Sequence, residues 1–179
     1  MSQFTLLDLD SAPKASQPLL QQSQKAFGSI PNLHAVMAHS PQVLDAYQQL
    51  HQLFVQCSLS DEEKTVVWQT INLQNQCHYC VPAHTAIAKM MKISDKLIDA
   101  LRHNKAMPTI KLQVLHDTTV LLLKNHGQLS ESEQQKFYDA GFNQAQLLEV
   151  VLGISQKTLS NYVNHLAKTP LDDAFKPYA

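Results

Sequence analysis

The chain has 179 residues, which suits one compact domain, and 44% of them are hydrophobic, as in an ordinary globular protein. Its 14 basic and 15 acidic residues give a formal net charge of -1, so the charge balance does not favour binding to nucleic acid or to an anionic membrane surface. No run of about 18 apolar residues is present, and we expect no transmembrane helix.

The N-terminal sequence MSQFTLLDLD lacks the positive start and the apolar run of a secretory signal. Three cysteines are too few for a secreted disulfide scaffold. We therefore expect a cytoplasmic protein, in which a closely spaced cysteine pair is metal-binding or redox-active. We expect a single domain over residues 1–179, with residues 1–15 as a loosely ordered N-terminal arm.

Apolar residues recur at helical spacing along the chain, and alternating strand patterns are hard to find. The first predicted helix covers residues 16–27 and ends at Gly28. Signals for later helix starts are Ser40 followed by Pro41, Ser60 with Glu63, Ser94, Pro108, Ser130 with Glu133, and Asn143. The last long helix stops before Pro170. The sequence therefore predicts an all-α fold of seven to nine helices.

Residues 77–84 read CHYCVPAH and carry the chemistry that the sequence suggests. We expect a helix from about Cys77 to Met91, on which Cys77, Cys80 and His84 project from one side. The first turn of a helix offers free backbone N–H groups and the positive end of the dipole, and both favour a thiolate. Such surroundings lower a cysteine pKa from about 8.5 into a range of roughly 3.5 to 7.5. The spacing thus predicts a reactive thiolate, a second thiol and a nearby base.

A structural zinc site is an alternative interpretation of the same residues. Zinc takes four ligands in such sites, and Cys77, Cys80 and His84 supply three. The fourth would be Cys57 or a distant histidine, although Cys57 lies on an apolar helix face and is expected to be an inert core thiol. Attachment of a c-type haem is excluded because Val81, not histidine, follows Cys80. The redox interpretation requires no metal and no organic cofactor.

The run SLSDEEKTVVWQTINLQNQCHYCVPAHTAIAKM resembles the signature of the carboxymuconolactone decarboxylase superfamily, in its alkylhydroperoxidase D-like (AhpD-like) branch. The likeness extends over roughly residues 20 to 179. It implies a compact, all-helical AhpD-like domain with the C-x-x-C motif at a helix N-terminus. It also implies a homo-oligomer, either a trimer or a hexamer.

The resemblance further implies a thiol-dependent alkyl hydroperoxide reductase that acts in antioxidant defence. Cys80 would attack an organic hydroperoxide or H2O2, and Cys77 would resolve the sulfenic acid as a disulfide. His84 matches the histidine of the family's proton relay. The reductant would be a protein dithiol of the lipoyl-linked or thioredoxin-like kind.

One departure from the family pattern concerns the relay glutamate that peroxidase members usually carry twelve residues before the first cysteine. That position is Thr65 here, and Glu62, Glu63 or water would have to take its place. Glu63 also has a simpler role as the capping partner of Ser60. The alternatives are a non-catalytic or zinc-stabilised oligomer and a lactone decarboxylase, although the decarboxylase members generally lack C-x-x-C.

A second polar group lies in the last long helix. Asn161, Tyr162, Asn164 and His165 interrupt an otherwise apolar segment. The resemblance places this region near the redox centre or at an oligomer contact. A buried polar network or a subunit interface explains these residues at least as well as a direct catalytic role.

Overall fold

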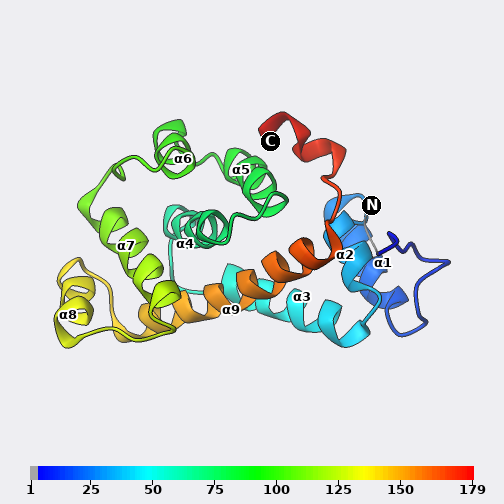
Figure 1. Cartoon of the computed structure of the whole chain (residues 1–179), viewed down its shortest axis with the longest axis horizontal. Helices are drawn as coiled ribbons and strands as arrows, with labels where there is room; N and C mark the ends of the chain where they lie inside the picture. The colour runs from blue at the N-terminus through cyan, green and yellow to red at the C-terminus, as the bar shows by residue number, and fades with distance from the viewer. Residues whose placement is uncertain (1–3) are drawn as a thin grey trace.

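The computed structural model describes residues 4–179, so residues 1–3 of the expected N-terminal arm lie outside the described residues. Within the described range the chain forms nine α-helices, one 3₁₀ helix and no strand (Figure 1). This confirms the predicted all-α fold. The elements are α1 (Gln17–Phe27), α2 (Asn32–Met37), α3 (Pro41–Val55), α4 (Asp61–Gln74), α5 (Cys80–Met90), α6 (Asp95–Arg102), α7 (Ile110–Lys124), α8 (Glu131–Asp139), α9 (Gln144–Ala167) and η1 (Asp173–Tyr178).

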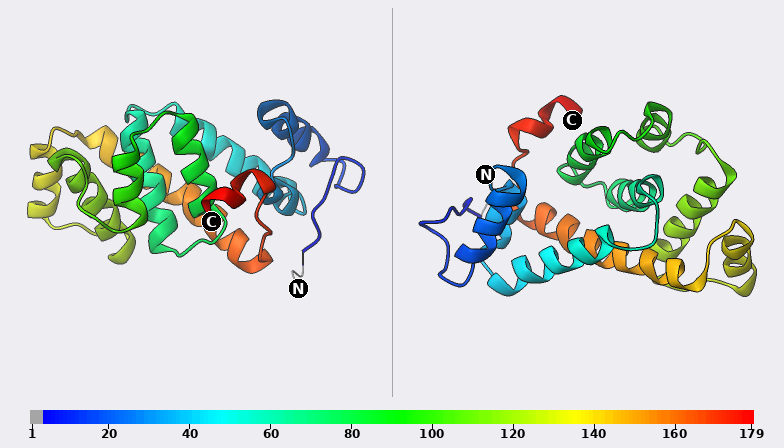
Figure 2. Two further views of the ribbon diagram at one scale, coloured as in Figure 1. Left: turned by 90° about the horizontal axis from the view of Figure 1, so that it is seen from above. Right: turned by 180° about the vertical axis from the view of Figure 1, so that it is seen from behind.

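Helix α4 lies at the centre of the arrangement and packs against α5, α7 and α9. The long helix α9 runs beside α3 along one side of the molecule (Figure 1). Helices α1 and α8 lie at opposite ends of the long axis, and the C-terminal segment η1 lies beside α5 in each view (Figure 2). The elements that carry the cysteine motif and the polar segment of α9 are therefore brought together around α4.

The predicted capping residues begin most of the observed helices. The Ser60 hydroxyl accepts a hydrogen bond from the Glu63 N–H at 3.3 Å, and the Glu63 carboxylate accepts one from the Ser60 N–H at 2.8 Å. Side-chain caps of the same kind lie at Ser40, Ser94, Ser130 and Asn143. Helix α7 differs from the prediction, because Thr109 caps it and Pro108 lies outside the helix. Local sequence signals therefore set the helix starts.

The cysteine motif differs from the prediction in one respect, since α5 begins at Cys80 and Cys77 lies in the turn before it. Gln76 takes a left-handed conformation with φ of 50°, and the Cys77 N–H donates to the Asn72 carbonyl at 2.9 Å. This arrangement ends α4 and turns the chain towards α5. The predicted position of C-x-x-C at a helix N-terminus is confirmed, with Cys77 just outside the helix.

The buried apolar side chains form two clusters. The larger cluster gathers around α4, α6, α7 and α8 and includes Phe54, Leu115 and Phe137. The second cluster joins the N-terminal helices to the cysteine motif, and it contains Leu44 and Tyr47 together with both cysteines. The thiols thus belong to a hydrophobic core. Among the described residues, none of the helices combines the length and the hydropathy needed to cross a bilayer.

Candidate active site

Two buried cysteines form the centre of the candidate site. Cys77 is 0% exposed and Cys80 is 1% exposed, and they are not joined by a disulfide. The Cys80 N–H donates a hydrogen bond to the Cys77 sulfur at 3.3 Å, so Cys77 occupies the place of a capping acceptor at the start of α5. This contact holds the two residues together at the positive end of the α5 dipole.

One face of α9 supplies polar side chains to the cysteines. This face consists of Gln156, Lys157, Ser160, Asn161 and Asn164, each no more than 1% exposed. The Asn164 amide donates to the Cys80 sulfur at 3.3 Å and lies 3.9 Å from the Cys77 sulfur. The Ser160 hydroxyl lies 3.9 Å from the Cys80 sulfur. The polar segment that the sequence singled out therefore contributes directly to the site.

Amide side chains on α4 connect α5 to α9. Gln69 donates to the Val81 carbonyl at 3.1 Å, and Asn72 donates to the Cys80 carbonyl at 3.3 Å. The Asn161 amide on α9 donates to the Asn72 side-chain oxygen Oδ1 at 3.1 Å. Because these amides are buried and hydrogen-bonded, they set the position of the first turn of α5 relative to α9.

The surroundings shift the pKa values of the two thiols in opposite directions. Burial acts to raise the pKa of Cys80, but the hydrogen bond from Cys77, the charge of Lys157 and the hydrogen bonds of Ser160 and Asn161 together lower it below the ordinary value. The hydrogen bond to Cys80 and burial raise the pKa of Cys77. The arrangement therefore favours a thiolate at Cys80 and a thiol at Cys77 at neutral pH.

His84 lies on the buried side of α5 and contacts Lys157 rather than a carboxylate. Its Nε2 atom lies 2.8 Å from the Lys157 Nζ, and its ring packs against Trp68 with a centroid distance of 4.9 Å. Burial, the charge of Lys157 and then His51 lower the pKa of His84 well below its ordinary value. His84 is therefore neutral at pH 7, and its role in a proton relay stays a prediction.

Comparison with solved structures identifies the fold. No family model and no curated protein matches the sequence. The AhpD core of an uncharacterised peroxidase-related protein from Ralstonia eutropha JMP134 aligns with a TM-score of 0.86 and 21% identity, over 97% of this chain and 94% of that one. A peroxidase-related protein from Silicibacter sp. TM1040 aligns with a TM-score of 0.80 and 19% identity, over 97% and 94% of the two chains. The chain has the AhpD-like fold.

The AhpD-like fold also includes a debrominase. The structure of the debrominase Bmp8 aligns with a TM-score of 0.77 and 14% identity, over 99% of this chain and 96% of that one. A variant of Bmp8 has been solved in complex with 2,3,4-tribromopyrrole and aligns with a TM-score of 0.76. The AhpD-like fold therefore occurs in proteins named for different chemistries.

The two glutamates considered as substitutes for the relay glutamate lie elsewhere in this AhpD-like chain. The Glu63 carboxylate caps α4 and forms an ion pair with Lys111 at 2.7 Å. Glu62 is exposed to solvent. The Thr65 hydroxyl donates to the Asp61 carbonyl of its own helix at 2.8 Å. The expected place of the relay acid is thus filled by a side chain that cannot ionise.

Lys157 and Ser160 on α9 and Gln69 and Asn72 on α4 are site residues that sequence reasoning missed. A signal was present, because Lys157, Ser160, Asn161 and Asn164 follow the spacing of one helix face within an apolar segment. The polar motif itself divides between two faces, since Asn161 and Asn164 are buried whereas Tyr162 and His165 are exposed. The His165 ring lies 2.9 Å from the Asn75 carbonyl, outside the cysteine site.

The zinc interpretation lacks a fourth ligand. Cys57 packs against the larger core cluster, whereas Cys77 and Cys80 belong to the second one. Burial raises the pKa of Cys57, as expected for an unreactive thiol. Across residues 4–179, no three or more His, Cys, Asp or Glu side chains are grouped so as to hold a metal ion.

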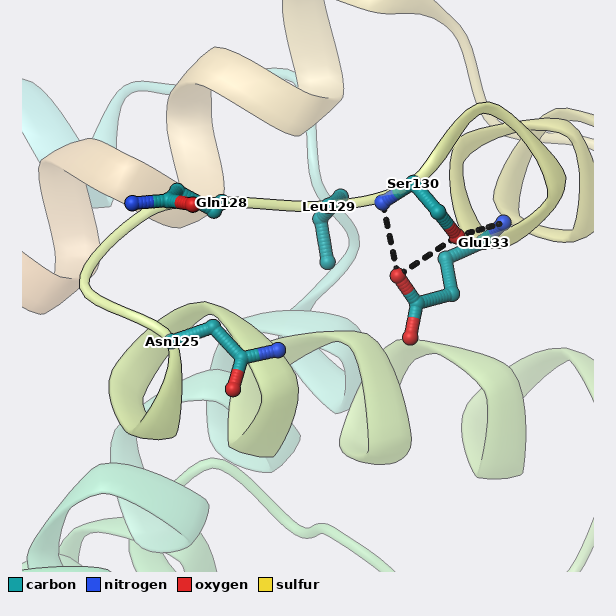
Figure 3. Close-up of a pocket in the computed structure, with 5 residues that line it drawn as sticks. All are labelled: Asn125, Gln128, Leu129, Ser130 and Glu133. Carbon is teal, nitrogen blue, oxygen red and sulfur yellow. Dashed lines mark hydrogen bonds between the residues drawn. The ribbon is translucent and has the colours of Figure 1, made fainter.

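A surface pocket lies between α7 and α8 (Figure 3), and Figure 1 shows α8 well away from α5, which carries Cys80. It is lined by Asn125, Gln128, Leu129, Ser130 and Glu133. Ser130 and Glu133 bond to each other as the capping box of α8. Ser130 and Glu133 therefore have a structural role, and the cysteine pair remains the candidate centre of chemistry.

Proposed function

We propose that the chain is a thiol-dependent hydroperoxide reductase with Cys80 as nucleophile and Cys77 as resolving cysteine. The observation that carries this proposal is a pair of adjacent buried sulfurs in which Cys77 accepts the Cys80 N–H at 3.3 Å and Cys80 accepts the Asn164 amide at 3.3 Å. These surroundings lower the pKa of Cys80 and raise the pKa of Cys77. A dithiol reductase needs one ionised sulfur to attack and one protonated sulfur to follow. The AhpD-like fold and its peroxidase-related members support the same assignment.

The proposed reaction begins with attack by the Cys80 thiolate on the terminal oxygen of ROOH. The S–O bond forms, the O–O bond breaks, and the released alkoxide takes up a proton to become ROH. The Cys77 sulfur then attacks the Cys80 sulfenic acid, which forms the disulfide and releases water that carries the Cys77 proton. An external dithiol supplies two electrons and two protons to restore both thiols.

The Asn164 side chain provides a place for the hydroperoxide. Its amide nitrogen donates to the Cys80 sulfur, while its carbonyl oxygen is buried and has no hydrogen-bond partner among the described residues. The O–H of a hydroperoxide is a donor that suits this acceptor. Because both sulfurs are buried, small hydroperoxides should react faster than bulky ones.

We propose the partners and the compartment that the sequence suggested. A protein dithiol of the lipoyl-linked or thioredoxin-like kind is the expected reductant, and a reducing compartment such as the cytoplasm would keep the pair reduced. We propose no metal and no organic cofactor for the cycle, because the two thiols and the external dithiol carry both electrons.

Reductive debromination is a second candidate, favoured by a row of aromatic rings that leads to the cysteine helix. Tyr47 stacks on His51, His51 stacks on Trp68, and Trp68 contacts His84. Flat brominated rings pack well against such surfaces. In this reaction the dithiol supplies two electrons, hydrogen replaces bromine on the ring, and bromide leaves. The likeness to the debrominase Bmp8 supports the candidate.

A stopped assay with H2O2 and with cumene hydroperoxide, coupled in turn to a small dithiol and to thioredoxin, tests the proposal. Cys80→Ser should abolish peroxide consumption, Cys77→Ser should leave a sulfenic acid that a probe can trap, and Cys57→Ser should behave as the wild type. Mass spectrometry should find a Cys77–Cys80 disulfide after oxidation.

Unchanged peroxide turnover in Cys80→Ser would overturn the assignment. Bromide release from a brominated pyrrole without peroxide consumption would instead favour the second candidate.

A further inference from the structure

Lys157 is a buried cation without an acidic partner. It is 1% exposed, and the ion pairs between Lys or Arg and carboxylates in residues 4–179 do not include it. Burial of an ammonium group without a counter-charge costs several kcal/mol, so buried lysines are nearly always paired. A specific compensating group is therefore required near the Lys157 Nζ.

The titratable groups around Lys157 come mainly from two helices. His84 and Cys80 lie on α5, with Cys77 in the turn before it, and His51 lies on α3 together with Tyr47, which stacks on it. Both histidines have lowered pKa values and are neutral at pH 7, because burial and then nearby positive charge disfavour their protonated forms. Burial raises the pKa of Tyr47, so it is also neutral. A neighbouring cysteine is the remaining source of negative charge.

Helix α4 supplies no charge to this environment. The position where the family pattern has an acid is Thr65, and the other side chains that α4 presents towards α5 and α9 are Trp68, Gln69 and Asn72. The nearest helical neighbours of Lys157 on its own buried face, Ser160 and Asn161, are neutral hydrogen-bonding groups. The site thus holds one cation and an ionisable thiol, with no carboxylate.

We propose that the Lys157 ammonium is the counter-charge of the Cys80 thiolate, in a site where Thr65 stands in place of the expected relay acid. This inference rests on the proposed function, since it concerns the same nucleophile. Lys157 is a positioning residue: its Nζ–H donates to the Nε2 lone pair of His84, which holds the ammonium beside the first turn of α5. His84 is then an acceptor with its proton on Nδ1, and it orients the cation.

The proton balance follows from this pairing. The Lys157 ammonium balances the negative charge that Cys80 carries once its thiol has lost a proton. When the O–O bond of a hydroperoxide breaks, the alkoxide takes up one proton, which balances the one that Cys80 lost, and the sulfur becomes neutral sulfenic acid. The ammonium then lacks its counter-charge until reduction regenerates the Cys80 thiolate.

The experiment compares Lys157→Met, which keeps the length of the side chain and removes the charge, with Lys157→Arg, which keeps the charge. Thiolate formation is followed by ultraviolet absorbance against pH, with the Cys80→Ser protein as the blank. We expect Lys157→Met to raise the pKa of Cys80 by roughly 1 to 3 units. Peroxide kcat/KM at neutral pH should fall about tenfold or more and recover as the pH is raised. Lys157→Arg should show a Cys80 pKa and a peroxide kcat/KM between those of Lys157→Met and those of the wild type.

The matched control is Lys124→Met, the same chemical change at an exposed position near the end of α7. It should leave both the thiolate titration and turnover unchanged. A Lys157→Met protein that folds and titrates as the wild type would overturn the inference. A failure of the proposed function would be recognised separately, as unchanged peroxide turnover in the Cys80→Ser protein.

A measurement on the reduced wild-type protein covers the case in which Lys157→Met does not fold. Nitrogen NMR of the His84 ring at neutral pH should show the proton on Nδ1 and an unprotonated, hydrogen-bonded Nε2. A proton on Nε2 would mean that His84 donates to a neutral amine, and the inference would be wrong.

Discussion

At the scale of single residues, a hydrogen-bond donor contacts the Cys80 sulfur, and the buried Lys157 is bonded to His84 on the same helix as Cys80. The family pattern leads one to expect a carboxylate that orients a basic histidine, but this chain has Thr65 at that position and a lysine bonded to the histidine. A carboxylate would repel a thiolate, whereas an amide donor and an ammonium group stabilise it. On the proposed mechanism, the reactivity of Cys80 therefore depends on the groups that stabilise its thiolate.

Replacing Asn164 measures how much its amide donor lowers the pKa of Cys80. Asn164→Leu keeps the approximate volume of the side chain and removes the donor that lies 3.3 Å from the Cys80 sulfur. Because a hydrogen bond to a charged group contributes about 1.5–3 kcal/mol, we expect the pKa of Cys80 to rise by about 1–2 units. The pH dependence of thiolate absorbance measures this shift.

Tyr162→Phe provides the control for Asn164→Leu, because Tyr162 is exposed on the same helix. Its thiolate titration should match that of the wild type. An Asn164→Leu protein with an unshifted titration would show that the amide does not stabilise the sulfur anion.

At the scale of helices, the site depends on how closely α9 approaches α3 and α4. Gly153 permits this approach, since a Cβ atom built there would lie 2.7 Å from Phe54 Cε2 and 2.8 Å from Val67 Cγ1. Both neighbours are fully buried and have little room to move. One turn further along α9, the polar face begins, so the same crossing brings Lys157 and Asn164 to the cysteines.

Gly153→Ala should therefore destabilise the fold, although alanine is the better helix former. We expect overpacking to lower the free energy of unfolding by about 1–3 kcal/mol, which exceeds the helix-propensity gain of about 0.5–1 kcal/mol. Urea unfolding measures the change. Ser155→Ala, at an exposed position on the same helix, should have a small effect. A Gly153→Ala protein with a higher free energy of unfolding than the wild type would contradict this prediction, because α9 could then move away from α3 and α4 without a large energetic penalty.

At the scale of the whole molecule, several histidines are buried in the neutral form, which makes stability depend on pH. Burial and then the charge of His51 lower the pKa of His34 to about 4. Burial and then the charge of Lys157 lower the pKa of His51 to about 4. In the unfolded chain both have ordinary values of about 6.5, so the unfolded state binds more protons between these pH values.

The stability contributed by these histidines is fully present above pH 6.5 or so and is lost as the pH falls towards 4. We expect the free energy of unfolding to fall by on the order of 2–3 kcal/mol for each histidine over this range. Urea unfolding at a series of pH values measures the slope. His34→Asn should reduce the slope, whereas His126→Asn in an exposed loop should not. A wild-type stability that is flat across this range would contradict the prediction.

Self-association is the second prediction at this scale. Helix α9 exposes Leu148, Val151, Tyr162 and Leu166, and Leu166 is 74% exposed. If the chain forms the trimer or hexamer expected from its family resemblance, these side chains should lie in the interface. Light scattering should then show an oligomer that Leu166→Lys weakens and Lys124→Met does not. A monomeric wild-type protein would exclude the predicted assembly.

The helix starts and the C-x-x-C motif could be read from the sequence because they depend on residues three or four positions apart. Ser60 and Glu63 form their capping box, and Cys80 and His84, four residues apart, share one side of α5, whatever the rest of the chain does. The predicted start of α5 is wrong because the left-handed residue Gln76 ends α4, and the chain then continues through non-helical residues 77–79 before α5 begins at Cys80.

Only the tertiary structure decided which polar groups meet the cysteines. Lys157 reaches His84 across 73 positions of sequence, and Asn164 reaches Cys80 across 84. Both contacts depend on the helix crossing at Gly153, and no local spacing encodes the angle at which two helices pack. Packing also selects the face of α9 that is buried, and this face surrounds Cys80 with donors and a cation. Glu63 stays bonded to its own helix start and to Lys111.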